Sequence, residues 1–275
     1  MLYCNKPEFL PTSNRAVCYG DGIFETIRVW KGQPLFWNFH LCRIKNGLAT
    51  LQLEQPNRLY FDNLYQEITA KARELANENL RVRLSFVRKE GGFYLPQRND
   101  FEQIIQFFEL NSAPFPLYEK GIKLAIAPNV RLPCDVLSNC KTLNGLRYIL
   151  AAQAAQQQQA DEAILLNTNE RIAEASNANL FIIKHQQLIT PPLTEGCVAG
   201  VCRAFLLAKA ADLGYESVEK PLHLADVAQA ESVFLSNVIS GLRPVATILN
   251  LPNTNFDIKK VANLTQNLQK MIKKG

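Results

Sequence analysis

Apolar residues in the first part of the chain recur with two different periods. Between residues 80 and 86 apolar and polar side chains alternate, as in a strand with one buried face. Elsewhere apolar residues return every three or four positions, which predicts amphipathic helices. The predicted strands are 23–30, 80–86 and 101–110, and the predicted helices are 38–53 and 61–75.

The later part of the chain continues this mixture of short apolar runs and helical periods. The predicted strands are 122–127, 163–166, 179–184, 188–190, 231–236 and 243–249, and the predicted helices are 145–158, 201–213 and 257–273. The helix at 201–213 is expected to end at Gly214, because glycine readily adopts the left-handed conformation of a C-cap.

The stretch Asn111-Ser-Ala-Pro-Phe-Pro116 interrupts both periods and is the best candidate for a linker. A chain of 275 residues is long enough for two domains. We therefore expect an α/β (α+β) protein. Its parts are a small N-terminal α/β domain at 1–112, a linker at 113–118 and a larger C-terminal domain at 119–275.

Composition narrows the class of protein. The seven cysteines form no CxxC pair and no Cys/His ligand spacing, which favours reduced thiols and predicts no metal site. The formal charge is only +5, which does not favour a nucleic-acid partner. No apolar run approaches the length of a signal peptide core or a membrane span. We expect a cytoplasmic protein without a membrane partner.

Lys141 is a first candidate for chemistry, in the segment Asn139-Cys-Lys-Thr-Leu-Asn144 before a predicted helix. A lysine acts as nucleophile and base only when partial desolvation makes its neutral amine available. Lysines are far more often surface residues. This segment alone leaves both interpretations open.

Glu174 is the only charged residue between Ile172 and Lys184, in a run of small side chains that leads into a predicted strand. Burying a carboxylate is costly without a cationic partner. That partner is either a basic side chain in a structural ion pair or a bound cation, such as a protonated pyridine nitrogen.

Two features could bind a phosphate. The helix predicted at 201–213 begins directly after Gly200, and the backbone N–H groups at a helix start bind phosphate well. Many helices begin after glycine, however. Arg43 lies three residues after His40 on one flank of a predicted helix. Its guanidinium could bind phosphate bidentately, or its stem could simply cover the apolar face.

Taken together and in order, these segments resemble the class IV aminotransferases, also called fold-type IV pyridoxal-phosphate enzymes. That family includes branched-chain aminotransferases, D-amino acid transaminases and aminodeoxychorismate lyases. The resemblance spans most of the chain. The matching segments are 14–29, His40-Leu-Cys-Arg43, Lys141-Thr-Leu-Asn144, 160–166, 174–181 and Gly200-Val-Cys-Arg203.

The resemblance implies pyridoxal 5'-phosphate as cofactor, with Lys141 as its Schiff-base lysine and Glu174 beside its pyridine nitrogen. Glu174 would keep that nitrogen protonated, so that the cofactor can absorb electrons from the substrate. Lys141, once released by a small-molecule amino substrate, would move a proton as base and acid. A homodimer with each active site near the interface is also implied. The expected phosphate ligands are the Arg43 side chain and the amides of Val201, Cys202, Val238 and Ile239.

Within the family, the chain looks most similar to the lyases. Transaminases usually carry a glutamate followed by Val/Ile-Thr-Pro near residue 241, whereas this chain has Ser236-Asn-Val-Ile-Ser-Gly-Leu-Arg-Pro-Val245. Lys141-Thr-Leu-Asn144 and Gly20-Asp-Gly-Ile-Phe-Glu-Thr26 also resemble the lyase pattern. Branched-chain enzymes usually have a tyrosine where this chain has Gly145. The implied function is 4-amino-4-deoxychorismate lyase, which releases pyruvate and forms 4-aminobenzoate in folate biosynthesis.

Two other functions stay open. One is an amino-acid transaminase of the branched-chain or D-amino acid type, which uses a 2-oxo acid acceptor. The other is a catalytically silent relative that acts as a binding protein. The joint presence of Lys141, Glu174 and Arg43 argues against the silent relative, because a protein released from catalysis is free to lose any of them.

One position departs from the lyase pattern. Lyases often have an arginine after the double glycine of the first domain, but here Gly91-Gly92 is followed by Phe93-Tyr94. Another arginine must then bind the substrate carboxylate, unless each is an ordinary surface or ion-pair residue. We prefer Arg28, because it shares a strand face with Thr26, which we also assign to the substrate. The candidates are Arg28, Arg88 and Arg147.

Overall fold

The computed structural model describes residues 3–5, 11–75, 77, 79–252 and 255–274. The chain forms two compact units. Unit 1 comprises Met1–Pro114 and Cys140–Asn144, and unit 2 comprises Phe115–Asn139 and Gly145–Gly275. The segment Cys140–Asn144, expected in the C-terminal domain, belongs instead to unit 1, because its backbone pairs with a strand of that unit.

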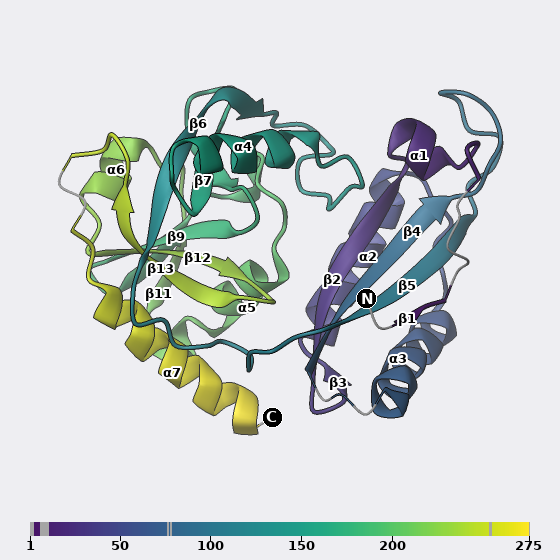
Figure 1. Ribbon diagram of the computed structural model, residues 1–275, viewed down its shortest axis with the longest axis horizontal. Helices are drawn as coiled ribbons and strands as arrows, with labels where there is room; N and C mark the ends of the chain where they lie inside the picture. The colour runs from purple at the N-terminus through teal and green to yellow at the C-terminus, as the bar shows by residue number, and fades with distance from the viewer. Residues whose placement is uncertain (1–2, 6–10, 76, 78, 253–254, 275) are drawn as a thin grey trace. The chain divides into compact units, whose positions relative to one another are not determined.

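Unit 1 is built on an antiparallel five-stranded sheet in the order β1-β5-β4-β2-β3 (Figure 1). The long strands β2, β4 and β5 and the helices α2 and α3 confirm the elements predicted from periodicity in this part of the chain. The strands are β1 (Tyr3–Cys4), β2 (Gly22–Trp30), β3 (Gln33–Pro34), β4 (Asn79–Arg88) and β5 (Phe101–Glu109). The helices are α1 (Arg15–Tyr19), α2 (Trp37–Thr50) and α3 (Arg58–Glu74).

Alternation along β2 and β4 gives the sheet of unit 1 two different faces. On one face, Ile27 and Val82 pack with Leu48 of α2 and Ile68 of α3, and all four side chains are fully buried. Burial of this face is the main stabilisation that the two helices gain, because an isolated amphipathic helix is only marginally stable. The other face carries the polar positions of the alternating pattern, among them Arg83.

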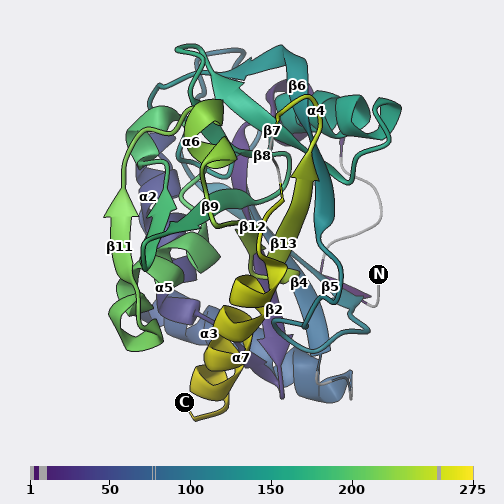
Figure 2. The same cartoon turned by 90° about the vertical axis from the view of Figure 1, so that its left-hand side faces the viewer.

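Unit 2 contains a mixed eight-stranded sheet in the order β11-β10-β9-β12-β13-β6-β7-β8, with β11 at one edge (Figure 2). The pairs β10–β11, β13–β6 and β6–β7 are parallel. The strands are β6 (Ile122–Leu132), β7 (Glu162–Asn167), β8 (Ile172–Ala175), β9 (Asn179–Lys184), β10 (Gln187–Thr190), β11 (Glu216–Glu219), β12 (Ser232–Asn237) and β13 (Gly241–Ile248). The helices are α4 (Leu146–Gln157), α5 (Val201–Lys209), α6 (Leu224–Ala228) and α7 (Ile258–Lys274), with 3-10 turns η1 (Leu193–Glu195) and η2 (Ala211–Leu213).

Apolar side chains cover both faces of the sheet of unit 2. On one face Leu165 of β7 packs with Ala151 and Ala155 of α4. On the other face Ile164 of β7 belongs to a cluster that includes Val227 of α6. β7 is therefore buried on both faces, which explains why its sequence is an almost continuous apolar run.

The differences from the predicted elements have a common cause. β1, β3, β8, β11, α1 and α6 were not predicted, and none of them is longer than five residues. Such short segments do not complete enough periods to be recognised. β6 also continues to Leu132, beyond the predicted 122–127. Gly214, with φ of 83°, ends the helical segment as predicted, and its N–H donates to the Ala211 carbonyl.

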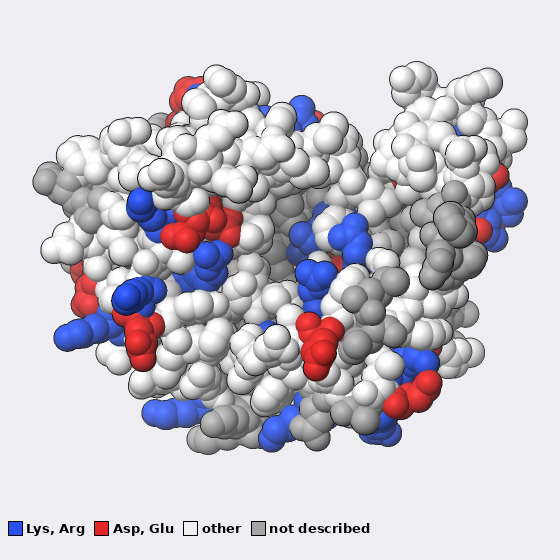
Figure 3. Space-filling model, viewed as in Figure 1, with Lys and Arg blue, Asp and Glu red and all other residues white. Residues whose placement is uncertain are grey.

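On the face drawn in Figure 3, Lys and Arg side chains lie among Asp and Glu side chains, so the net charge of +5 is not gathered there into one uniform basic surface. None of the helices in the described part of the chain has the length and apolar character needed to cross a bilayer.

Candidate active site

The segment that contains Lys141 pairs with the edge of β2 through an isolated bridge. The N–H of Phe24 donates to the Lys141 carbonyl at 2.9 Å, and the N–H of Leu143 donates to the Gly22 carbonyl at 3.0 Å. Between these bonds Ile23 and Thr142 form an antiparallel bridge. The backbone of the lysine is thus held by a sheet rather than by a loop.

This pairing decides which way the Lys141 side chain projects. Residues that face each other across an antiparallel pair project to the same side of the sheet. Lys141 stands opposite Phe24, and its Nζ lies 4.6 Å from the centroid of the Phe24 ring. The amine therefore lies on the face opposite α2 and α3, where the neighbouring even-numbered residue of β2 is Thr26.

On the helical side of the same strand, Glu25 binds two side chains of α2. Arg43 donates to its two oxygens from Nε at 2.7 Å and Nη2 at 2.6 Å, and His40 Nδ1 lies 2.6 Å from Oε2. Burial alone would raise the pKa of Glu25, but the charges and hydrogen bonds of Arg43 and His40 outweigh it and lower the pKa to about 2. Arg43 therefore has one bidentate edge of its guanidinium, formed by Nε and Nη2, engaged by Glu25.

His40 is influenced by these charges and by that of Lys141. Burial lowers the pKa of its imidazole; Glu25 acts against that shift, and the positive charges of Arg43 and Lys141 reinforce it. A neutral imidazole that donates to Glu25 carries its proton on Nδ1. Unit 1 thus brings Lys141, His40, Arg43 and Glu25 within electrostatic reach of one another.

In unit 2, Glu174 lies on β8 and is only 3% exposed. Its Oε1 accepts hydrogen bonds from the Tyr148 hydroxyl at 2.8 Å and from the N–H of Val198 at 3.0 Å, and its Oε2 accepts from Asn179 Nδ2 at 3.1 Å. Burial and the charge of Glu174 raise the pKa of Tyr148, so its hydroxyl stays a donor. The three donors orient the carboxylate and stabilise its charge.

The same contacts fix the loop before α5. Asn179 Nδ2 also donates to the Val198 carbonyl at 2.9 Å, and Asn139 Nδ2 donates to the Cys197 carbonyl at 2.8 Å. A Cβ on Gly200 would come within 1.8 Å of Asn179 Oδ1. A side chain at position 200 would therefore displace Asn179, which orients Glu174. Helix α5 begins at the next residue, Val201.

The first turn of α5 lies beside β12, which ends at the loop to β13. Burial raises the pKa of the Cys202 thiol to about 12, and the Ser236 hydroxyl acts against that shift. In the loop itself, the Asn237 Oδ1 accepts from the N–H of Ile239 at 3.0 Å and from that of Ser240 at 2.7 Å. The Ile239 amide, which we expected at a phosphate, is thus engaged within its own turn.

Arg28 does not have the environment that we expected of a substrate ligand. Its side chain is fully buried, and Nη2 donates to Asn79 Oδ1 at 2.7 Å and to the Ser112 carbonyl. The alternating pattern placed Arg28 on the correct face of β2, but this end of the strand is covered by distant segments of the chain. We therefore do not assign the substrate carboxylate to Arg28.

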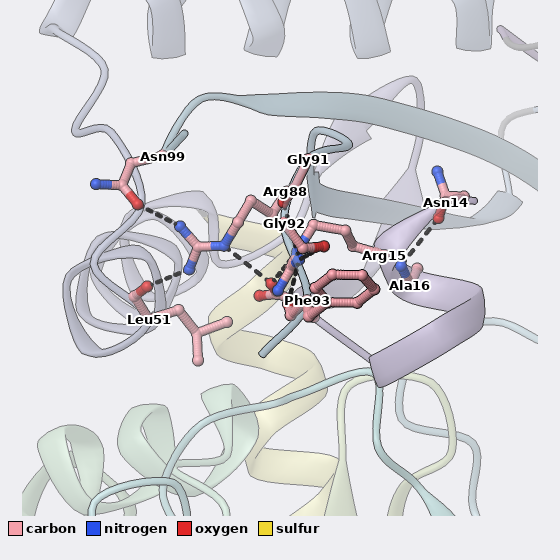
Figure 4. A network of polar contacts seen from close by, with 10 residues as sticks. Asn14, Arg15, Ala16, Leu51, Arg88, Gly91, Gly92, Phe93 and Asn99 are labelled. Carbon is pink, nitrogen blue, oxygen red and sulfur yellow. Dashed lines mark hydrogen bonds and ion pairs between the residues drawn. The ribbon is translucent and has the colours of Figure 1, made fainter. Parts of the chain in front are cut away.

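Arg88 is also a structural residue (Figure 4). It is 4% exposed, and its guanidinium donates to Asp21 at 2.9 Å, to Asn99 at 2.6 Å and to the Leu51 carbonyl. Arg15 binds the same Asp21 and donates to the carbonyls of residues 91, 92 and 93. Arg15 thus holds the double-glycine turn in place, and Arg88 binds the Asp21 carboxylate that Arg15 also binds. The third candidate, Arg147, is exposed at the start of α4.

Sequence reasoning missed three residues that shape these sites. Glu25 was visible only as part of a matching segment, and its binding of Arg43 depends on the packing of α2 on β2. Tyr148 and Asn179 gave no signal, because their partner Glu174 lies 26 and 5 residues away along the chain. Asn179 also falls within the segment that matched the family.

The family model for amino-transferase class IV matches residues 22–248. This chain belongs to the class IV aminotransferase family. The match includes Lys141, Arg43, Glu174 and the start of α5. The protein is accordingly a pyridoxal-phosphate-dependent enzyme, and its mixed α/β fold agrees with that of fold-type IV enzymes.

Relatives of this class IV enzyme have more than one activity. An aminodeoxychorismate lyase of Vibrio harveyi is 28% identical over 263 residues, which cover 94% of each chain. A Methanocaldococcus jannaschii protein with a provisional assignment as a branched-chain-amino-acid aminotransferase is 29% identical, over 94% of this chain and 88% of the relative. The crystal structure of 4-amino-4-deoxychorismate lyase from Pseudomonas aeruginosa matches with a TM-score of 0.81 at 26% identity, covering 98% of each chain.

The residues present fit pyridoxal phosphate. The buried Glu174 carboxylate, with its neutral donors, suits a protonated ring nitrogen. The start of α5 supplies backbone amides for a phosphate, approached past a glycine that has no room for a side chain. Lys141 supplies an amine, and its backbone is hydrogen-bonded to β2.

Proposed function

We propose that this enzyme is a 4-amino-4-deoxychorismate lyase that releases pyruvate and forms 4-aminobenzoate. The observation that carries the proposal is the geometry of Gly241. Aligned on the following proline, Gly241-Leu-Arg-Pro244 stands where transaminases of the family usually have Glu-Val/Ile-Thr-Pro. The lyase relatives in Vibrio harveyi and Pseudomonas aeruginosa support the same assignment.

Gly241 has no room for that glutamate. Its φ is 70°, in the left-handed region that residues with side chains rarely adopt. A Cβ at this position would lie 2.7 Å from Cα of Phe115 and 3.1 Å from its ring. The obstacle is backbone, so it could not be relieved by a change of rotamer. The transaminase glutamate would require a different path of the chain here.

The family resemblance assigns a role toward the cofactor to each of several groups. Lys141 Nζ would bind the cofactor covalently, and Glu174 would stand beside its ring nitrogen. The amides of Val201 and Cys202 would bind its phosphate, as would that of Val238 in the loop between β12 and β13. Arg43 would contribute through the side of its guanidinium that Glu25 does not occupy.

Each residue has a separate task in the reaction. Bound pyridoxal phosphate withdraws electrons from the carbon framework attached to the substrate nitrogen. Lys141 Nζ would take a proton from the ring carbon that bears the substrate nitrogen. Cleavage of the ring C–O bond would then release enolpyruvate, which takes up a proton to become pyruvate, and the gain of aromaticity would drive the step. Glu174 keeps the positive charge on the ring nitrogen, and Tyr148 and Asn179 keep Glu174 in place.

We also propose that the enzyme is a homodimer. Unit 1 exposes a cluster of large apolar side chains at the turn held by Arg15, namely Phe93, Tyr94 and Leu95, each more than 80% exposed. Exposed apolar groups of this size favour a protein contact. Sedimentation equilibrium of the loaded enzyme tests the proposal, and a single species of about 31 kDa at all concentrations would contradict it.

The activity is tested by mixing the pyridoxal-phosphate-loaded enzyme with freshly made aminodeoxychorismate and no 2-oxo acid. We expect 4-aminobenzoate and pyruvate in equal amounts. Parallel reactions contain D- or L-amino acids with 2-oxoglutarate. Transamination in those reactions without any 4-aminobenzoate in the first would show a transaminase, as the Methanocaldococcus jannaschii relative suggests.

Two lysine variants complete this test. Lys141→Ala should abolish turnover and the covalent labelling of the protein by pyridoxal phosphate and borohydride. Lys120→Ala removes an exposed lysine and should change neither. Labelling that survives in Lys141→Ala would assign the cofactor to a different lysine.

A further inference from the structure

The face of the unit 1 sheet that carries Lys141 also carries two arginines of β4. In the antiparallel register Thr26 of β2 stands opposite Arg83, and Gln106 of β5 stands on its other side. Arg81 lies two residues before Arg83, so both side chains project from one face. The polar half of the alternating pattern in β4 therefore forms part of the surface next to Lys141.

Arg83 and Lys141 share one aromatic ring. The guanidinium carbon of Arg83 lies 3.9 Å from the centroid of Phe24, and Lys141 Nζ lies 4.6 Å from the same centroid. The distance between the Arg83 guanidinium carbon and Lys141 Nζ is therefore at most the sum of these two distances. One small molecule could contact both groups.

Neither arginine has a carboxylate within ion-pair distance among the described residues. The Arg81 guanidinium carbon lies 4.4 Å from the ring centroid of Phe108. The side chains of Arg81 and Arg83 are both half-buried. Three other poorly exposed arginines of this unit are ion-paired, whereas the buried Arg28 donates to Asn79 and to the Ser112 carbonyl. The ion-paired arginines are Arg15 and Arg88 with Asp21, and Arg43 with Glu25.

The environment of Arg83 is costly for a cation. Burial lowers the pKa of its guanidinium, and the like charge of Arg81 lowers it further. A bound anion would reverse both effects, because it replaces lost hydration and screens the repulsion. Stacking on Phe24 offsets part of the cost but supplies no hydrogen-bond acceptor.

Arginines also stack on aromatic rings merely to cover a sheet, with their stems on apolar surface. That explanation suffices for Arg81 on Phe108. It leaves unexplained why Arg83 shares its ring with the lysine that carries the chemistry.

We propose that Arg83 binds a carboxylate of the substrate, at the end remote from the amine that reacts at Lys141, and that Arg81 adds to the positive field there. This inference rests on the proposed function of Lys141. It assigns the substrate to amino compounds that carry an additional anionic group, and it separates them from purely aliphatic amino acids.

The assignment replaces the arginine that follows the double glycine in many lyases. The turn after Gly91-Gly92 has no arginine here. Arg83 has a planar guanidinium that can bind a carboxylate bidentately. In aminodeoxychorismate, the reacting amine and the ring carboxylate lie at opposite ends of a six-membered ring. Such a molecule can place its amine at Lys141 and its carboxylate at Arg83.

Binding is measured by calorimetry on the pyridoxal-phosphate-loaded enzyme with chorismate as probe. Chorismate keeps both carboxylates of the proposed substrate but has a hydroxyl group in place of the reacting amine, so turnover is not needed. We expect Arg83→Gln to weaken binding about 10- to 100-fold, because a hydrogen-bonded charge pair is lost. Arg83→Lys should recover part of the loss, and Arg81→Gln should have a smaller effect.

The matched control is Arg58→Gln, which removes an arginine of the same unit whose side chain is 93% exposed and should bind chorismate as the wild type does. Thermal melting and borohydride labelling of Lys141 show that each variant is folded and loaded. Equal binding by Arg83→Gln and wild type, or no binding by the wild type, would overturn the inference. The lyase assay distinguishes this inference from the proposed function. If the wild type binds chorismate through Arg83 but yields no 4-aminobenzoate, only the proposed reaction is contradicted.

Discussion

The N–H of Phe24 donates to the carbonyl of Lys141 at 2.9 Å, although 117 residues separate the two along the chain. This bond and its neighbour at Gly22 attach the lysine to the edge of β2. A strand edge holds a side chain more precisely than a loop does. The position of the reacting amine is therefore set by how closely the segment 141–143 can approach β2.

Gly22 packs against both β4 and that segment, and Gly22→Ala should disturb both contacts. A Cβ there would lie 2.4 Å from the Phe86 carbonyl oxygen and 2.8 Å from Cδ1 of Leu143. We expect a loss of stability of about 1–3 kcal/mol, as for other overpacked sites. We also expect turnover to fall more than about tenfold, because Lys141 is displaced. Urea unfolding and the lyase assay measure the two effects.

The control for this variant is Gly145→Ala. Gly145 follows the same segment, but no atom lies within 4 Å of an added Cβ, and its φ of −102° suits any residue. The free energy of unfolding of Gly145→Ala should differ from that of the wild type by no more than about 0.5 kcal/mol. If both variants behave alike, close packing at Gly22 does not position the lysine.

Glu174 and Tyr148 should differ in their contributions to catalysis. Glu174→Gln removes the negative charge that would hold the cofactor nitrogen protonated, so kcat should fall about 100-fold or more. Tyr148→Phe leaves the charge and removes one donor, and a loss of about tenfold is expected. Kinetics at saturating cofactor, with absorption spectra of the bound cofactor, compare the two. A larger loss in Tyr148→Phe would contradict these roles.

Gly200 and Asn179 should act as one unit. In Gly200→Ala the new methyl group would displace Asn179 Oδ1, which lies 1.8 Å from the Cβ position. Asn179→Ala removes the same contact to Glu174 directly. We therefore expect each single variant to lower kcat, and the double variant to be no worse than the poorer single one.

The cycle of four proteins is measured under one set of conditions, with circular dichroism to confirm that each is folded. Additive losses would mean that Gly200 is needed for a reason of its own, such as the approach of the phosphate to the amides of α5. That outcome would remove Asn179 from the account of how Glu174 is oriented.

Local patterns in the sequence were sufficient for the long elements. β2, β4, α2 and α3 follow from period alone, because each has one buried face and enough residues to repeat the pattern. The pattern could not show that Cys140–Asn144 joins the sheet of unit 1, since a segment of five residues that pairs with a distant strand leaves no period.

The arginines show a second limit. Alternation places Arg28 and Arg83 on the same face of neighbouring strands, and nothing local distinguishes them. The difference lies in what covers each one: Asn79 and Ser112 bind Arg28, whereas Arg83 lies over Phe24 beside Lys141. Such coverage depends on contacts between residues far apart in the sequence, so the choice of Arg28 could be corrected only in three dimensions.

The buried group of Glu25, His40 and Arg43 should make the protein sensitive to acid in two steps. The folded state lowers the pKa of His40, so the unfolded chain takes up that proton first, and stability should fall as the pH drops below about 6.5. The pKa of Glu25 is lowered from 4.5 to about 2, so its stabilising contribution is complete above pH 4.5 and is lost as the pH falls toward 2. Both shifts therefore make the folded state more stable at neutral pH than in acid.

Urea unfolding at intervals from pH 7.5 to 3.5 measures these steps, and each group can contribute a slope of at most about 1.4 kcal/mol per pH unit. His40→Gln should remove the step below pH 6.5 and keep the one below 4.5. His185→Gln is the control, because that histidine is exposed and its replacement should leave both steps in place. A step near pH 6.5 that persists in His40→Gln would show that another group takes up the proton on unfolding.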